Sequence, residues 1–277
     1  MTAPLPPLSA LGEQVRRQDG ERFVTTLFAD PAARADLWLL YAFNAELAQV
    51  RTQVRQPLAG LIRLQWWREV VEGGRRQETV GHPLAAALQD LIVRRELPTA
   101  PLQAMVEARE RDLEPVAFDD VPQWLAYGRD GAGALTHLAC VVLGAECPAA
   151  SAAGTAWALT ALLRSVPIHL GQGWLTLPRQ SLEAAGLGTD TVLAGKADRA
   201  RLAGVVLDLV AQAQAQLAAA RRHRAVRRVL PALLPAVQAA IHLRRIRAGG
   251  GNLFDERLRE RSPMPLRLAW AAVRGRL

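Results

Sequence analysis

Apolar residues recur at helical spacing in one segment of this chain after another, and this periodicity limits the fold more than any other feature. In residues 32–53, one stripe of a helix would carry Leu37, Leu40, Tyr41 and Leu47. Sustained alternation of apolar and polar residues, which marks strands, is almost absent, and so are Asn-Gly hairpin turns. The sequence therefore predicts an all-α protein with one domain, whose helices surround a core.

Proline and glycine set the expected limits of these helices. We expect a flexible N-terminal segment at residues 1–19 and a helical domain at residues 20–277. Pro167 is expected to end the helix that begins near Gly154, and residues 180–197 to be loosely structured. The expected helices cover residues 32–53, 59–72, 83–95, 101–113, 121–143, 154–166, 198–227, 231–248 and a short segment after Pro265.

Three glycines, Gly128, Gly131 and Gly133, lie inside the expected helix 121–143. Each glycine in a helix interior costs about 1 kcal/mol relative to alanine, so three of them need a structural reason. Close packing against a neighbouring backbone and space left for a ligand are both adequate reasons. The sequence leaves these two alternatives open.

Basic residues concentrate in the last fifth of the chain. Residues 221–277 hold 14 Arg and three acids, a net charge of +11, whereas the whole chain carries +8, which leaves −3 for residues 1–220. Such a segment attracts anionic lipid, binds nucleic acid, or is a solvated helix face. Few aromatic residues interleave with the Arg clusters and no nucleic-acid motif is present, so no nucleic-acid partner is expected. Contact with an anionic membrane surface and a solvated face remain as alternatives.

The N-terminus and the cysteines indicate the compartment. The first residues lack the order of a signal or transit peptide, and no apolar run approaches the ~18 residues of a membrane span. Cys140 and Cys147 have no second pair and no clustered histidines, so no metal site and no cofactor are expected. We expect a cytoplasmic protein that contacts the inner face of the cytoplasmic membrane peripherally.

The stretch from residue 154 to 178 places polar side chains on an apolar helix. Arg164, Ser165 and His169 share much of one face, because residues four apart lie together on a helix. Unpaired burial of such groups is costly, which favours the wall of a cavity. A core helix whose polar end reaches solvent is the alternative.

Several motifs, taken in order, resemble the squalene/phytoene synthase family of isoprenoid synthases. The resemblance covers about residues 20–275 and implies an all-α, isoprenoid-synthase-like fold around a central cavity. The motifs are Tyr-Ala-Phe at 41–43, Asp-Leu at 112–113, Tyr-Gly-Arg-Asp-Gly-Ala-Gly at 127–133, Val-Leu-Gly at 142–144, the helix at 154–164 and Leu-Pro at 177–178.

The chain departs from the family at its metal-binding positions. The family's enzymes join two prenyl diphosphates through Mg²⁺ held by two aspartate-rich motifs, because a departing diphosphate needs its charge neutralised. Mg²⁺ prefers carboxylate oxygens, and histidine suits it poorly. The resemblance therefore implies a protein without a metal site and without catalysis. The aspartate positions correspond here to Ala48, Gln49, Thr52, Ser165 and His169.

Within the family, residues 43–50, 60–67 and 163–169 resemble a catalytically degenerate branch that includes the mitochondrial assembly factor of respiratory complex I. The resemblance implies a protein that assists assembly of a membrane respiratory complex, with subunits or assembly factors as partners and a prenyl lipid as a candidate ligand. The alternative is a divergent prenyl-diphosphate transferase, with Glu46 and Asp130 as substitute acids, or a prenyl-lipid-binding protein.

The resemblance and the spacing also suggest which residues line the cavity. Tyr41 and Phe43 are expected either there or in the plain core. Asn44 and Glu46, with Gln49, would form a polar network in place of the metal site. His169 would either bind a headgroup or cap the end of its helix. The full set of candidates is Tyr41, Phe43, Asn44, Glu46, Tyr127, Arg129, Thr160, Arg164 and His169.

Overall fold

Helices make up the computed structural model of the protein, and the all-α prediction is confirmed. The structure describes residues 9–79, 81–114, 116–255, 258 and 264–275, and these residues contain no strand. Most helices begin where the sequence predicts, because proline or a side-chain cap fixes their first turn. The first eight helices are α1 (Ala10–Gln18), α2 (Gly20–Thr26), α3 (Pro31–Gln53), α4 (Pro57–Val71), α5 (Arg76–Thr79), α6 (Pro83–Arg94), α7 (Thr99–Glu110) and α8 (Val121–Gly128).

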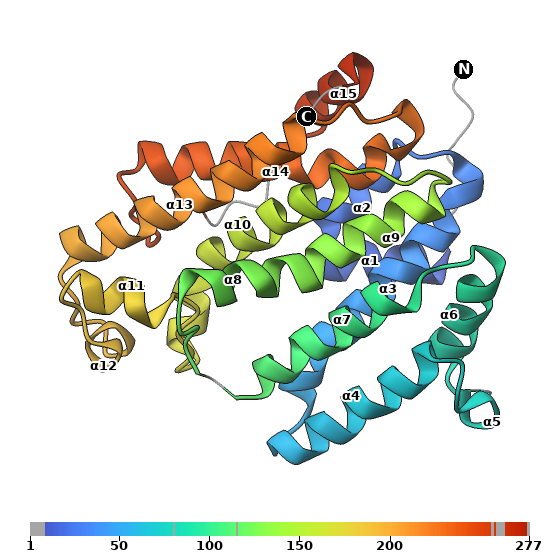
Figure 1. The fold of residues 1–277 in the computed structure, drawn as a ribbon, viewed down its shortest axis with the longest axis horizontal. Helices are drawn as coiled ribbons and strands as arrows, with labels where there is room; N and C mark the ends of the chain where they lie inside the picture. The colour runs from blue at the N-terminus through green and yellow to red at the C-terminus, as the bar shows by residue number, and fades with distance from the viewer. Residues whose placement is uncertain (1–8, 80, 115, 256–257, 259–263, 276–277) are drawn as a thin grey trace.

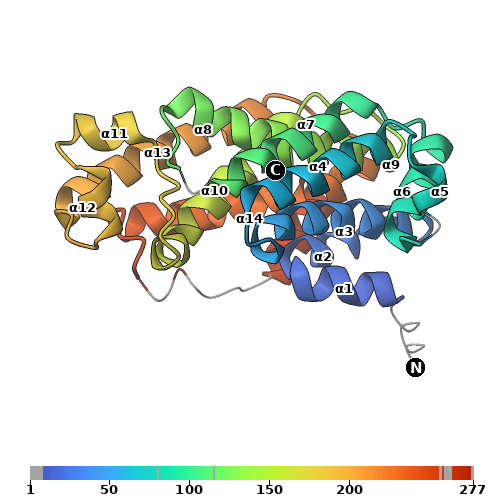
Figure 2. The same ribbon diagram turned by 90° about the horizontal axis from the view of Figure 1, so that it is seen from below.

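Among the described residues, three of the four longest helices lie in the second half of the chain (Figures 1 and 2). Both views show α11 and α12 at one end of the bundle and α5 and α6 at the other. The helices are α9 (Ala134–Val142), α10 (Ala150–Gly171), α11 (Arg179–Ala184), α12 (Thr189–Leu193), α13 (Arg199–Arg221), α14 (Leu230–Ala248) and α15 (Pro265–Arg274), with short helical turns η1 (Arg111–Leu113), η2 (Arg129–Gly133) and η3 (Arg227–Val229).

Helix α10 lies at the centre of the bundle and contacts α8, α9, α13 and α14. A helix that is apolar on all sides requires neighbours on all sides. The buried residues of α10 satisfy this condition, since they fall on every side of its first four turns. These neighbours leave the C-terminal part of α10 to form the wall of a cavity.

The glycines of residues 121–143 serve both purposes that the sequence left open, close packing against a neighbouring backbone and space beside a cavity. A Cβ atom on Gly133 would lie 3.0 Å from Thr155 Oγ1 on α10, and one on Gly154 of α10 would lie 2.2 Å from Ala132 O. These glycines therefore let the two backbones approach closely. Gly131 differs, because nothing lies within 4 Å of its missing Cβ and it lines a cavity. It sits in η2, a π-helical turn of the kind often found at functional sites.

Three helix limits differ from prediction by four residues or more, and the first is the start of α10 at Ala150 rather than near Gly154. Helix α10 continues through Pro167 to Gly171, because an internal proline removes one hydrogen bond and the residues beyond it can still form theirs. The helix expected at 198–227 ends at Arg221. The loosely structured segment 180–197 contains the short helices α11 and α12.

The expected flexible segment 1–19 is wrong for its second half. Residues Ala10–Gln18 form helix α1, which Ser9 caps and which packs on α3. Val15 is buried, and the backbone at Gly12 lies against the ring of Trp38. Residues 1–8 lie outside the described part of the chain.

Helix α13 is long and apolar enough to span a membrane, by length and composition alone. Of its most apolar 18-residue stretch, 39% is buried inside the protein. Leu202, Val206 and Leu209 supply part of this burial, and α10 and α14 are its main neighbours. Core helices of soluble proteins pass the same test.

Gly154→Ala tests the close contact between α10 and η2. The added methyl group overlaps Ala132 O, so the helices must separate, and we expect the free energy of unfolding to fall by about 1–3 kcal/mol. Gly131→Ala is the matched control, because its methyl group enters open space and its effect should stay within about 1 kcal/mol. Thermal and urea unfolding of both variants measure the change in the free energy of unfolding. Equal effects would contradict the packing account.

Candidate functional site

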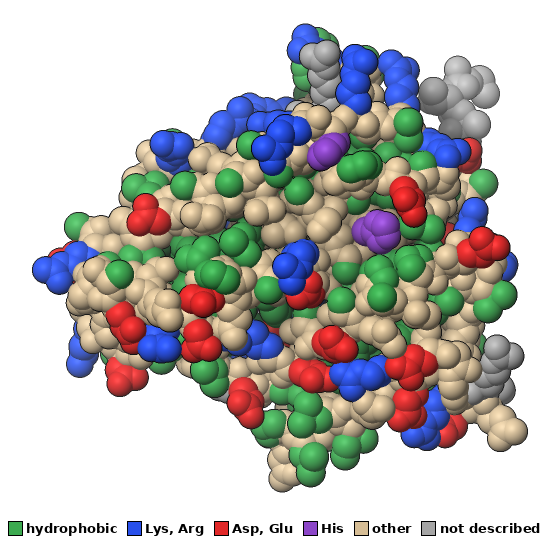
Figure 3. Space-filling view, in the orientation of Figure 1, with side chains coloured by type: hydrophobic (Ala, Val, Ile, Leu, Met, Phe, Trp, Pro, Cys, Tyr) green, Lys and Arg blue, Asp and Glu red, His purple; other side chains and the backbone are tan. Residues whose placement is uncertain are grey.

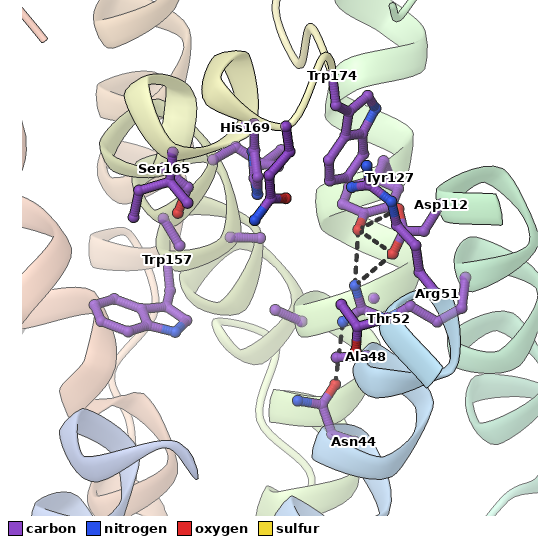
Figure 4. A pocket seen from close by; sticks show the side chains of 18 of the residues that line it. Asn44, Ala48, Arg51, Thr52, Asp112, Tyr127, Trp157, Ser165, His169 and Trp174 are labelled. Atoms are coloured by element: carbon purple, nitrogen blue, oxygen red, sulfur yellow. Dashed lines mark hydrogen bonds and ion pairs between the residues drawn. The ribbon is translucent and has the colours of Figure 1, made fainter. Parts of the chain in front are cut away.

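A cavity of about 390 Å³ lies between α3 and α10, with η2 and the loop after α10 closing two of its sides. Figure 4 shows Ser165 and His169 on one side, facing Ala48 and Thr52 on the other. Its volume falls within the ~300–1,000 Å³ typical of ligand sites. The lining residues are Arg22, Asn44, Ala48, Arg51, Thr52, Arg109, Asp112, Tyr127, Gly131, Ala132, Trp157, Ala158, Ala161, Leu162, Ser165, Ile168, His169, Gln172 and Trp174. The predicted central cavity is present.

Helical spacing explains which residues reach the cavity. On α3, Asn44, Ala48 and Thr52 are four residues apart and share one face, while Leu47 and Val50 point into the core. On α10, Ala158, Ala161, Ser165 and His169 form the facing stripe.

Four of the five positions that match the family's aspartates lie on this cavity: Ala48, Thr52, Ser165 and His169. Gln49 does not, and its side-chain oxygen instead accepts a hydrogen bond from Gln53 at 3.1 Å. The facing walls therefore meet as the resemblance predicts. They offer a methyl group, two hydroxyls and an imidazole.

Asp112 is the one carboxylate among the described lining residues, and it is already engaged. Tyr127 donates its hydroxyl to Asp112 Oδ1 at 2.9 Å, and Arg109 donates to Asp112 Oδ2 at 3.1 Å and to the Tyr127 oxygen at 2.7 Å. Burial raises the pKa of Tyr127 above its usual range, so its hydroxyl stays protonated and keeps donating. The Arg109 guanidinium also reaches Asn44 Oδ1 at 3.5 Å.

These residues do not fit the Mg²⁺ ions on which the family's enzymes depend. Such ions require several oxygen ligands, mainly carboxylates. In the described part of the chain, no group of three or more His, Cys, Asp or Glu residues is arranged to hold a metal ion. The single carboxylate of the cavity already balances the charge of Arg109.

His169 is a neutral group in the cavity. Burial, with the nearby charge of Arg51 as a second cause, lowers the pKa of His169 to about 4. Its Nδ1 atom lies 3.5 Å from Thr176 Oγ1, and its ring centroid lies 4.4 Å from that of Trp174. At pH 7 the imidazole therefore offers hydrogen bonds and no positive charge. Among the described residues, its ring forms no hydrogen bond with a backbone carbonyl of its helix.

The end of α10 explains how Trp174 reaches His169. Gly173 adopts a left-handed conformation with φ of 70°, which glycine enters without strain. The chain then turns back, and the Trp174 N–H donates to His169 O at 2.9 Å. The Trp174 ring lies 3.9 Å from the guanidinium carbon of Arg51 on α3, so it bridges the two walls.

Arg51 is the charge that the cavity leaves available. Arg22 is paired with Asp19 at 2.7 Å, and Arg109 with Asp112 at 3.1 Å. Within the described residues, no carboxylate forms an ion pair with Arg51, whose guanidinium only stacks on Trp174. The cavity thus combines an unpaired cation with the apolar walls formed by Trp157, Leu162 and Ile168.

Arg164 was predicted to line the cavity and instead forms part of a buried clamp. It donates to Glu21 at 3.1 Å, and His242 on α14 approaches the same carboxylate at 3.2 Å. Burial would raise the pKa of Glu21, but the hydrogen bond with His242 and the charge of Arg164 together lower it. This clamp joins α2, α10 and α14 beside the cavity.

Five other candidates also lie away from the cavity. Tyr41 and Phe43 belong to the core, as their alternative interpretation held. The Thr160 hydroxyl donates to Ala156 O within its own helix, a bond that serine and threonine readily make when buried in helices. Glu46 forms an ion pair with Arg63 of α4, so it faces away from the cavity. Arg129 is exposed on η2 and pairs with Asp130.

Asn44, Tyr127 and His169 are the candidates that the structure places in the cavity. The cavity is also lined by four residues that the sequence did not predict there: Arg22, Arg51, Arg109 and Trp174. Helical spacing could have found Arg51, which lies three residues after Ala48. Arg109 and Trp174 come from other elements, and no local pattern links them to this site.

The helical fold and this cavity define an isoprenoid-synthase-like protein. The solved structure of squalene synthase HpnC from Alicyclobacillus acidocaldarius superimposes with a TM-score of 0.75 at 22% identity, covering 87% of this chain and 93% of the other. A dehydrosqualene synthase bound to a ligand gives a TM-score of 0.77 at 18% identity, with 95% and 94% covered. These likenesses confirm the predicted fold.

The family profile described as squalene/phytoene synthase matches residues 15–267, and the chain belongs to this family. A Bos taurus protein named NADH dehydrogenase (ubiquinone) complex I, assembly factor 6, is 28% identical over 263 residues. That match covers 92% of this chain and 79% of the bovine protein. The resemblance of the motifs to the squalene/phytoene synthase family is thus confirmed. The similarity to the branch that includes the complex I assembly factor is confirmed as well.

Arg51→Met tests the electrostatics of the cavity. Removing the Arg51 charge should raise the pKa of His169 from about 4, without restoring about 6.5, because the burial remains. Since the folded state lowers this pKa, protonation favours unfolding, and the loss of stability appears as pH falls below about 6.5. Histidine NMR titration measures the pKa, with Arg199→Met as the control, because Arg199 is exposed and does not line the cavity. An unchanged His169 pKa would contradict the account.

Proposed function

We propose that this chain is a non-catalytic member of the squalene/phytoene synthase family that assists assembly of a membrane respiratory complex of the complex I type. One observation carries the proposal: the facing walls of the family's cavity hold Ala48, Thr52, Ser165 and His169. Metal-dependent departure of a diphosphate needs carboxylate oxygens at such positions.

The remaining acids do not replace them. Asp112 is committed to Arg109 and Tyr127. Glu46 and Asp130, the substitute acids suggested by the sequence, are paired with Arg63 and Arg129 and do not line the cavity. This arrangement argues against the alternative of a divergent prenyl-diphosphate transferase.

The assembly role is supported by the bovine relative, which is named as a complex I assembly factor. The match spans most of both chains, so it concerns the whole helical domain rather than one motif. On this proposal, the partners are subunits of the complex or other assembly factors.

A second proposal concerns the ligand of the cavity. The unpaired Arg51 and the apolar walls suit an anionic amphiphile with a hydrocarbon chain, such as a prenyl lipid. Arg51 would bind the anionic head directly, since a guanidinium presents several donors to an oxyanion and needs no bridging metal. Trp157 and Leu162 would contact the chain.

Deletion of the gene in its natural host tests the assembly role. We expect the amount of assembled NADH dehydrogenase complex, measured on native gels, to fall and to recover when the wild-type chain is supplied from a plasmid. Prenyl-lipid content should stay unchanged, because no prenyl transfer is lost. An unchanged amount of complex, with loss of a prenyl product, would favour the transferase alternative.

A further inference from the structure

Helix α15 has one face on the protein and one face without a partner in the described structure. Leu268 and Ala271 are buried and pack with Leu234 of α14. Leu266, Trp270 and Val273 are 84%, 59% and 69% exposed. These three lie at i, i+4 and i+7, so they form one apolar stripe along the outer side of the helix.

Arginines surround this stripe. Arg267 and Arg274 are exposed on α15 itself, and the Arg274 guanidinium carbon lies 4.2 Å from the centroid of the Trp270 ring. Arg227 of η3 donates to Val273 O at 3.4 Å, which ties the basic segment after α13 to the end of α15. Figure 3 shows several Lys and Arg side chains along this upper edge, whereas most acidic side chains lie on the lower half, together with other basic ones.

We define the α15 surface as Leu266, Arg267, Trp270, Val273 and Arg274 with the neighbouring Arg227, and we propose that it binds the surface of an anionic lipid bilayer. An amphipathic helix that lies in the membrane interface buries its apolar face among the lipids while its basic residues meet the head groups. Tryptophan is enriched at this depth because its ring is apolar and its N–H polar.

The shape and charge of the α15 surface favour lipid over other occupants. Helix α15 lies at the outer edge of the fold, above α14 (Figure 1), and the space-filling view shows this part of the surface projecting as a ridge (Figure 3). A stable protein interface buries ~800 Å² on each side with complementary shape, which a ten-residue ridge does not supply by itself. A bilayer needs no matching shape. The excess of arginine after residue 220 complements its negative charge.

This inference does not rest on the proposed assembly role or on the ligand of the cavity. A protein that lacked either one would still bind vesicles through α15. The surface therefore can be tested with the purified full chain, and its failure would leave the proposed function standing.

Vesicle flotation provides the test. The full chain is mixed with phosphatidylcholine vesicles with and without phosphatidylglycerol, and the bound fraction is measured. We expect binding only to the anionic vesicles. Arg267→Gln with Arg274→Gln should weaken it more than tenfold, since each charge contributes about fivefold. Trp270→Ser should weaken it about tenfold.

Matched controls carry the same chemical changes elsewhere. Ile62 of α4 is 64% exposed, and Ile62→Ser removes this apolar side chain. Arg55→Gln with Arg199→Gln removes two exposed charges far from α15. Both control variants should bind the anionic vesicles within about threefold of wild type, even though the double variant also lowers the net charge. Circular dichroism melting checks folding, and if Trp270→Ser is unfolded, the arginine pair decides.

Three outcomes would overturn the proposal: no binding to anionic vesicles, equal binding to both vesicle types, or an equal loss in the controls. Light scattering identifies one other occupant. If the free chain is a dimer that Trp270→Ser converts to a monomer, and vesicles do not bind, then α15 contacts a second copy instead of a membrane.

Discussion

The close approach of α10 to η2 is the constraint on which the rest of the structure depends. Gly154 permits it, because any side chain there would overlap Ala132 O. With its first turns enclosed by neighbouring helices, α10 holds its last turns at a fixed position opposite α3. The space between them is the cavity, so the packing of small residues determines the geometry of the site. Gly131, which meets no neighbour, adds to that space.

The chemistry of the cavity follows from which charges are balanced there. Arg109 and Asp112 neutralise each other, with the Tyr127 hydroxyl between them. His169 is neutral because burial disfavours its protonated form. Among the described residues, Arg51 forms no ion pair with a carboxylate, so its positive charge is left unbalanced. The described lining residues therefore present one unpaired cation and no free carboxylate, whereas Mg²⁺ prefers several carboxylate oxygens.

Periodicity predicted most of the fold because each helix needs an apolar stripe and a start signal, and both are local properties. The four cavity-lining positions Ala48, Thr52, Ser165 and His169 could be placed from the family resemblance and helical spacing together. The partner of Arg164 could not, since Glu21, and the His242 that shares its carboxylate, come from distant parts of the sequence. Tertiary contacts likewise ordered α1, whose sequence alone suggested a flexible segment.

Diphosphate release tests the central claim, that the cavity does not support metal-dependent prenyl transfer. The folded, purified chain is incubated with Mg²⁺ and farnesyl or geranylgeranyl diphosphate, and released diphosphate is measured with and without a chelator. We predict release no faster than in buffer alone. Release that the chelator abolishes would contradict the account, and would show that oxygen ligands other than the aligned positions hold the metal.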